Sequence, residues 1–132
     1  MTTPSKNQSN QPPGPSGRAI AVSAIKKRQD FLAMRGAPGA SSPAFLMLAR
    51  ANPANHGAAR IGLTVTKKIG GAVVRNRIRR RLRAAAREIF PQAAQPDTDY
   101  VLIARKPAVD RNYALLLDDM KRALLRLSRS TI

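Results

Sequence analysis

The chain has 132 residues, 43% of them hydrophobic, which fits one globular domain with a real core. Its formal net charge of +17 implies a polyanionic partner: nucleic acid first, and an anionic membrane surface a distant second. The absence of cysteine excludes disulfides, a thiolate nucleophile and a cysteine-based metal site.

The first 20 residues are rich in Pro, Ser, Gln, Asn and Gly and show no apolar periodicity. They predict a disordered tail over 1–20, followed by one RNA-binding α+β domain over 21–132. The tail could also be a targeting extension, although nothing in it favours that role and it lacks the apolar core of a signal peptide. No apolar run approaches the roughly 20 residues of a membrane span, so we expect a cytoplasmic location and no membrane partner.

Residues 25–35, IKKRQDFLAMR, predict a short first helix that ends at Gly36. Phe31 and Met34 share one face of this helix because they are three positions apart. A phenylalanine at such a position is most often a core residue. Residues 37–43 predict a turn and, at most, a poorly formed strand.

Two strands are predicted next. Residues 44–50 form an apolar run of strand length, and in 60–66 the residues Ile61, Leu63 and Val65 alternate with small or polar ones. Such alternation is typical of a half-buried strand. The loop between the two strands carries His56, the single histidine. Without a neighbouring carboxylate cluster it is poor material for a metal site or an acid–base pair, so we predict no catalytic and no metal-binding residue.

A helix rich in arginine follows, entered through Gly70 and Gly71 and expected to end near Pro91. On a helical wheel, five apolar residues fall within roughly 80° of one another: Val74, Ile78, Leu82, Ala85 and Ile89. The opposite side carries Asn76, Arg79, Arg80, Arg83 and Arg87, and the flanks carry Arg75, Arg77 and Arg81.

The charge of this segment points to a ligand. From Lys67 to Arg87 there are nine basic residues and no acidic one. Like charges four positions apart, such as Arg79 and Arg83, destabilise an isolated helix by about 0.2–0.5 kcal/mol per pair. A bound polyanion removes this repulsion, and arginine suits bidentate contacts to phosphate and stacking on bases.

The C-terminal part predicts one more strand and one more helix. Residues 100–105 form a near-continuous apolar run, as expected of a central strand covered on both faces. Asp110 or Asn112 can cap a last helix. Its apolar residues follow helical spacing: Tyr113, Leu116, Leu117, Met120, Leu124 and Leu127. We predict an α+β fold in αβββαβα order, with helices packed on a single, mostly antiparallel sheet of about four strands.

Residues 60–83, RIGLTVTKKIGGAVVRNRIRRRLR, closely resemble the signature of the bacterial ribonuclease P protein component. That signature has a strand ending in Thr-Lys-Lys, a glycine or alanine turn, and an Arg-Asn-Arg motif followed by more basic residues. Here the motif is Arg75-Asn76-Arg77. IKKRQDF at 25–31 and DYVLIARKPA at 99–108 resemble two other segments of the family, so the likeness covers about 25–127.

The resemblance implies the small subunit of a ribonucleoprotein that removes the 5′ leader from precursor tRNA. Hydrolysis would depend on Mg²⁺ bound to the RNA subunit, and the protein, monomeric apart from the RNA, would supply no nucleophile or general base. The residues expected to bind the ribonuclease P RNA are Lys67, Lys68, Arg75, Asn76, Arg77, Arg79, Arg80 and Arg83. The family also joins its parallel strands through the arginine helix by a left-handed crossover, which breaks a rule obeyed by about 98% of such connections.

The resemblance further implies a cleft between the first helix and the sheet that holds the single-stranded leader. Its expected residues are Lys27, Arg28, Phe31, Arg35 and Phe45, although core packing is an equal prospect for Phe45. Family members often carry a second aromatic four positions after Phe31, where this chain has Arg35, whose guanidinium can also stack on a base. The alternative function is a non-catalytic RNA-binding protein of ribosomal type, which composition alone would favour.

Overall fold

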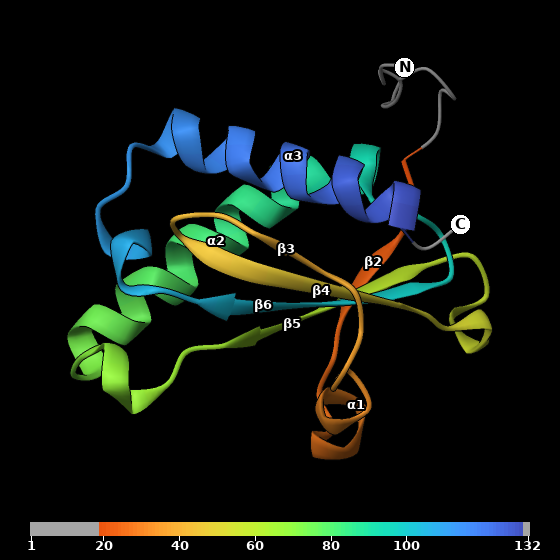
Figure 1. Ribbon diagram of the computed structural model, residues 1–132, viewed down its shortest axis with the longest axis horizontal. Coiled ribbons are helices and arrows are strands. Elements are labelled where there is room, and N and C mark those ends of the chain that lie inside the picture. Colours follow the sequence, from red (N-terminus) through yellow and green to blue (C-terminus); the bar gives the residue numbers. More distant parts are fainter. Residues whose placement is uncertain (1–18, 131–132) are drawn as a thin grey trace, which may run out of the picture.

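The computed structural model describes residues 19–130, which form one five-stranded sheet and three α-helices (Figure 1). The strands are β2 (Val22–Ala24), β3 (Gly39–Ser41), β4 (Phe45–Ala51), β5 (Ala59–Thr64) and β6 (Thr98–Ala104). The helices are α1 (Arg28–Leu32), α2 (Ala72–Ala93) and α3 (Tyr113–Ser130). Short 3-10 turns lie at η1 (Pro53–Asn55), η2 (Lys67–Ile69) and η3 (Lys106–Val109).

The predicted α+β class is confirmed, but the sheet differs from the prediction in two respects. Its strand order is β2-β5-β6-β4-β3, so it has five strands where about four were expected. It is mixed, because β5 pairs in parallel with both β2 and β6, while β4 pairs antiparallel with β6 and β3. The strand β2 escaped prediction because its three residues are too few to show alternation.

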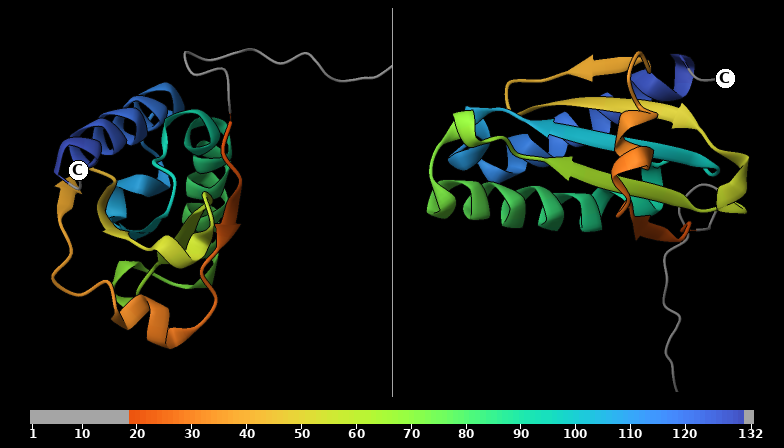
Figure 2. Two further views of the ribbon diagram at one scale, coloured as in Figure 1. Left: turned by 90° about the vertical axis from the view of Figure 1, so that its right-hand side faces the viewer. Right: turned by 90° about the horizontal axis from the view of Figure 1, so that it is seen from below.

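Helix α2 connects the parallel neighbours β5 and β6. In the right-hand view of Figure 2, α1 lies in front of the sheet, both strands point left, and β6 lies above β5. Helix α2 runs below β5 in this view and packs on the face of the sheet opposite α1. This arrangement is a left-handed crossover, as the family resemblance implied and against the general preference. The crossover places α2 on the face of the sheet opposite α1, and the outer side of the helix faces solvent.

The main core lies between the sheet and the pair α2 and α3 (Figure 1). The β6 residues Tyr100 and Leu102 face it, and the edge of the Tyr100 ring meets the Phe90 ring at a centroid distance of 5.1 Å. The predicted apolar stripe of α2 is buried here at Ile78, Leu82, Ala85 and Ile89, whereas Val74, in the first turn of the helix, is half-buried. The predicted apolar face of α3 is also confirmed: Leu116, Met120, Leu124 and Leu127 are buried.

Helix α1 packs on the other face of the sheet. Ile25, Met34 and Val101 form a small buried cluster there, with Phe31 and Leu48 partly buried against it. The helix is shorter than predicted, since turns replace helix after Leu32.

Two further boundaries differ from the predictions. Helix α2 continues two residues past Pro91, because the Phe90 carbonyl still accepts the Ala94 N–H at 2.9 Å. The predicted tail at 1–20 lies outside the described residues except for its last two, of which Ile20 packs against the core and donates its N–H to the Pro91 carbonyl at 2.9 Å. None of the helices within 19–130 has the length and apolar character that crossing a bilayer requires.

Candidate RNA-binding surfaces

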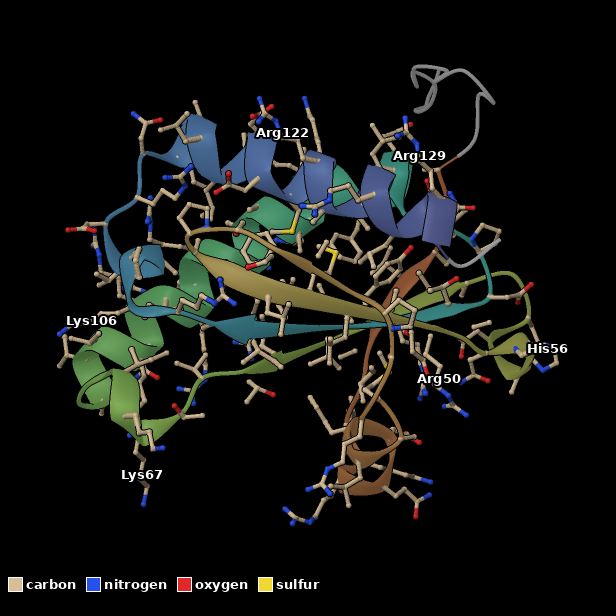
Figure 3. All side chains as sticks on the ribbon, viewed as in Figure 1. Arg50, His56, Lys67, Lys106, Arg122 and Arg129 are labelled. Carbon is tan, nitrogen blue, oxygen red and sulfur yellow. The ribbon has the colours of Figure 1, made fainter. Side chains whose placement is uncertain are left out.

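The predicted basic residues for the RNA subunit lie together on η2 and the first turns of α2. Lys67 and Lys68 are exposed in the η2 turn, and Figure 3 shows Lys67 projecting away from the body of the protein. On α2, Asn76, Arg77 and Arg80 are exposed. The turn and the helix of the sequence motif thus carry one group of basic residues, which we call the α2 basic surface. Its members are Lys67, Lys68, Arg75, Asn76, Arg77, Arg79, Arg80 and Arg83.

Acidic residues do not neutralise this surface. Among the described residues, no α2 arginine forms an ion pair with an aspartate or glutamate. The one acid of the helix, Glu88, accepts a hydrogen bond from the Tyr113 hydroxyl at 2.6 Å, which raises the pKa of Tyr113. Without an internal counter-charge, the surface is suited to an external anion.

Some arginines of α2 also hydrogen-bond within the protein. Arg75 Nε donates to the Gly70 carbonyl at 3.2 Å, and Arg79 Nη1 donates to Asn76 Oδ1 at 2.9 Å. Since a guanidinium has five N–H donors, each keeps further donors for a phosphate. These bonds hold the long side chains in place, which lowers the entropy lost when a ligand binds.

Arg81 has a structural role that the sequence did not reveal. Its Nη1 donates to the Ala108 carbonyl at 2.7 Å, and its Nη2 donates to the Arg111 carbonyl. Arg77 supports the same segment, with Nε donating to the Val109 carbonyl at 2.8 Å. Part of the arginine content of α2 therefore holds η3 and the start of α3 in place.

A groove lies beside β2 and β5, at this edge of the sheet. Its cavity volume is about 520 Å³, and it is bounded by β2, α1, β5 and the C-terminal half of α2. Phe31 lies on one side and Arg83 and Arg87 on the other, with Ile61 and Leu63 between them. The groove thus brings an aromatic ring, an aliphatic floor and two guanidinium groups to one place.

The ring of Phe31 packs on β5 at Gly62, which has no side chain. The ring is half-buried, and a Cβ atom added at Gly62 would lie 2.6 Å from its Cε1 atom. Three of the other predicted leader-binding residues are exposed on or beside α1: Lys27, Arg28 and Arg35.

The prediction for Phe45 requires correction. Its side chain is completely buried in the main core, on the face of β4 that also carries Met47. It therefore cannot stack on a base. Arg35 does not line the groove of Phe31 either; with Arg50 it borders a separate pocket of about 370 Å³ on the other side of α1.

A charged network fixes α1 to the sheet. Arg60 of β5 binds Asp99 of β6 through two bonds, Nε–Oδ1 at 2.9 Å and Nη2–Oδ2 at 2.8 Å. Its remaining Nη1 reaches Asp30 of α1 at 3.2 Å. Asn52 and Asn55 complete the shell of Asp99, donating at 2.9 and 2.8 Å. Because Asp30 immediately precedes Phe31, this network also sets the position of the ring.

The pKa of Asp99 reflects this shell. Burial alone would raise it, but the hydrogen bonds from Arg60, Asn55 and Asn52, with the Arg60 charge, outweigh burial and lower the pKa from 3.8 to about 2. The hydrogen bonds that Arg60 donates to Asp99 and Asp30, with the charges of these two carboxylates, outweigh burial and raise the pKa of Arg60. Asp99 is therefore an anion at neutral pH, and its two carboxylate oxygens accept hydrogen bonds from Arg60, Asn52 and Asn55.

The described residues offer no site for a metal ion, since no three His, Asp or Glu side chains among residues 19–130 are suitably grouped. His56 is exposed in the loop after η1, at the opposite end of the molecule from Lys67 (Figure 3).

Comparison with known proteins settles the family. A model of the family described as Ribonuclease P matches residues 21–128. The chain belongs to the ribonuclease P protein family. It is 48% identical over 104 residues to the ribonuclease P protein component of Caulobacter vibrioides, covering 79% of this chain and 70% of that protein. It is 42% identical over 102 residues to that of Erythrobacter litoralis, with 77% and 83% covered.

The fold agrees with this membership. The solved structure of the Staphylococcus aureus RNase P protein is 27% identical and matches with a TM-score of 0.65, covering 79% of this chain and 94% of that one. Within this ribonuclease P family protein, the sequence signature corresponds to β5, η2 and the start of α2. The Arg-Asn-Arg motif thus lies on the first turns of the crossover helix.

Proposed function

We propose that the chain is the protein subunit of a ribonuclease P ribonucleoprotein and assists removal of the 5′ leader from precursor tRNA. Membership of the family supports this function, and the single structural observation that carries it is the α2 basic surface without acidic partners. A protein that only needed a soluble helix would mix glutamates into such a face.

In this proposal, the α2 basic surface binds the RNA subunit. Lys67 and Lys68 would act as point charges toward phosphates, and the arginines would make bidentate contacts. Such contacts fix the position of the protein on the RNA without reading its sequence. Arg83 lies at the C-terminal limit of the surface, where it meets the groove.

The leader would bind in the groove beside Phe31, with Lys27, Arg28 and Arg35 providing positive charge around α1. Stacking a base on an aromatic ring contributes about 1–3 kcal/mol and tolerates any base. An enzyme that processes many different leaders needs this tolerance. The half-buried ring, held on Gly62, has one side packed and is suited to stacking.

Catalysis would be the work of the RNA subunit. We propose that Mg²⁺ ions bound to that RNA support hydrolysis, while the protein contributes binding and charge screening. Cationic side chains placed among crowded phosphates take over part of the screening that Mg²⁺ provides. The complex would therefore be an endoribonuclease whose protein component lowers the Mg²⁺ requirement. We further propose that the protein is monomeric apart from the RNA, has no membrane partner and acts in the cytoplasm, where precursor tRNA is made.

Reconstitution tests the proposal. Purified protein is added to a bacterial ribonuclease P RNA at low and at high Mg²⁺, and removal of the leader from a precursor tRNA is followed. We expect stimulation that is large at low Mg²⁺ and small at high Mg²⁺. Stimulation independent of Mg²⁺ would contradict the screening role. Tight RNA binding without stimulated cleavage would instead support an RNA-binding protein of ribosomal type.

A variant, Phe31→Ala, separates binding of the leader from binding of the RNA subunit in this experiment. Its ring should matter for precursor tRNA and not for the RNA subunit, so the variant should bind the RNA subunit normally and lose affinity for the leader-bearing substrate. Equal loss for mature tRNA and for precursor tRNA would contradict a leader contact.

A further inference from the structure

The arginines of α2 serve two different RNA strands. We infer that Arg87 binds phosphates of the single-stranded leader together with Arg83, the last member of the α2 basic surface, which turns from the RNA subunit to the leader, while the members before Arg83 bind the RNA subunit. The inference rests on the proposed function, and it assigns to Arg87 a role that the sequence motif does not give it.

The first observation is that Phe31 and the two arginines line one groove. Strand β2 ends at Ala24, whose pairing partner on β5 is Ile61, so beyond the bond from the Ile25 N–H to the Ile61 carbonyl, β5 has no paired strand on this side. Leu63 lies on this unpaired edge and lines the groove. A ligand can therefore lie against Phe31 on one face of the sheet and pass around the edge to α2 on the other (Figure 2).

The second observation is the chemistry of the lining. Apolar groups of Ile25, Phe31, Ile61 and Leu63 make one part of it, and the guanidinium groups of α2 make the other. A nucleotide has the matching parts, a base with apolar faces and a phosphate with negative charge. Both kinds of contact are independent of base identity. A double-stranded RNA would not fit this pattern, since its bases are stacked on one another.

The third observation concerns the two arginines themselves. Arg83 and Arg87 are exposed, and neither forms an ion pair with an acidic residue within 19–130. They are one helical turn apart, which corresponds to about 6 Å along the axis. Two like charges at this spacing repel each other unless an anion lies between or beside them.

Distance along the helix separates the two strands of RNA. Arg75 of the sequence motif is twelve residues before Arg87, which corresponds to about 18 Å along an α-helix. Arg75, Arg77, Arg79 and Arg80 do not line the groove, whereas Arg83 and Arg87 do. The helix is therefore long enough to hold the RNA subunit at one end and the leader at the other, and its rigidity fixes their relative position.

The test compares holoenzymes that carry Arg87→Ala, Arg83→Ala or both with one that carries Arg80→Ala. Arg80 is the matched control, because it is exposed on the same helix but outside the groove. Two precursor tRNAs are used, one with a leader of several nucleotides and one with a single-nucleotide leader. Binding of each protein to the RNA subunit alone is measured in parallel over a range of salt concentrations.

We expect Arg87→Ala to weaken binding of the long-leader substrate about three- to tenfold, and the double variant to weaken it further. The salt slope for that substrate should fall by about 0.7 per arginine, the value for a single strand. The single-nucleotide substrate and the RNA subunit should bind Arg87→Ala as they bind the wild type. Arg80→Ala should show the reverse pattern.

The inference is overturned if Arg87→Ala weakens RNA-subunit binding while the advantage of the long leader is unchanged. Arg87→Lys guards against a folding defect, because it keeps the charge and should retain most of the salt slope. If the wild-type holoenzyme binds both precursor tRNAs equally well, the proposed leader binding itself is wrong. If the wild type prefers the long leader but Arg87→Ala keeps this preference, only the role of Arg87 is wrong.

Discussion

The ring of Phe31 lies directly on the backbone of Gly62. A Cβ atom at Gly62 would be 2.6 Å from Cε1 and 2.7 Å from Cζ of that ring, closer than such atoms approach in proteins. Glycine in the interior of a strand weakens it, and such a position often marks the close approach of another group. Because Gly62 has no side chain, the Phe31 ring can pack directly against the backbone of β5 at the groove.

Gly62→Ala should displace the ring. The added methyl group must push Phe31 outward or shift α1, so we expect binding of leader-bearing substrate to weaken by about 1–3 kcal/mol, the value of a stacked base. Affinity for the RNA subunit should not change. Gly71→Ala is the control, because a Cβ there meets nothing within 4 Å. Equal affinities of wild type and Gly62→Ala for precursor tRNA would show that the packing of Phe31 on Gly62 has no effect on leader binding.

Acid should weaken the Arg60–Asp99 pair. The pKa of Asp99 is about 2 in the folded protein against 3.8 ordinarily, so the folded state favours the anion. The resulting stability, about 2 kcal/mol, is complete above about pH 4 and is lost as the pH falls toward 2. Denaturant unfolding measured between pH 7 and pH 2 would follow this loss.

Asp99→Asn supplies the control for the pH profile. The variant should be less stable at neutral pH, because Arg60 loses its partner beside a buried site. It should also lose the part of the acid dependence that belongs to Asp99. A variant whose stability falls with acid as steeply as that of the wild type would place the dependence on other carboxylates.

Arg79→Ala should reduce RNA binding without harming the fold. Each lost phosphate contact lowers the log–log salt slope by about 0.7–0.9. Thermal stability should remain unchanged or rise slightly, since repulsion with Arg83 is relieved. Salt titration and thermal melting on the same sample decide the matter. An unfolded variant, or a stable one with the wild-type slope, would make this position structural.

Arg81→Ala should behave in the opposite way. It removes the donors to the Ala108 and Arg111 carbonyls, and a hydrogen bond from a charged group contributes about 1.5–3 kcal/mol. We expect lower unfolding free energy and an unchanged salt slope for the fraction that stays folded. Arg81→Lys should recover only part of the stability, because an ammonium cannot hold both carbonyls in the same fork geometry. A loss of salt slope in Arg81→Ala would place Arg81 in the RNA interface.

Periodicity predicted the elements whose two sides differ. The alternation of Ile61 and Leu63 located β5, and the apolar stripe through Ile78 and Leu82 identified the buried side of α2. The spacing in α3 was equally informative, and Asn112, one of the two proposed caps, accepts the Leu115 N–H at 3.3 Å. In α2 and α3 one side meets water and the other meets the core, so the pattern records the environment. In β5 neither face is exposed, because Phe31 of α1 covers the side of Gly62.

Long-range contacts were beyond the reach of the sequence. Phe45 begins a run that is apolar on both faces, so nothing local indicates that it faces the main core rather than the groove. The order of the strands depends on pairing across many residues. Arg81 resembles its neighbours in sequence, and only the fold brings carbonyls of a distant turn within its reach.

The position of β6 between β5 and β4 has a consequence during synthesis. When α2 has just been translated, β6 and α3, which complete the core against its apolar stripe, do not yet exist, and without β6 the strands β5 and β4 cannot form one sheet. The arginines of α2 repel one another at that stage, so we expect the segment to remain unstructured on the ribosome until β6 is made. A nascent chain halted before residue 98 should show no hydrogen-exchange protection in 72–93, and supplied RNA could then induce the helix by neutralising its charge.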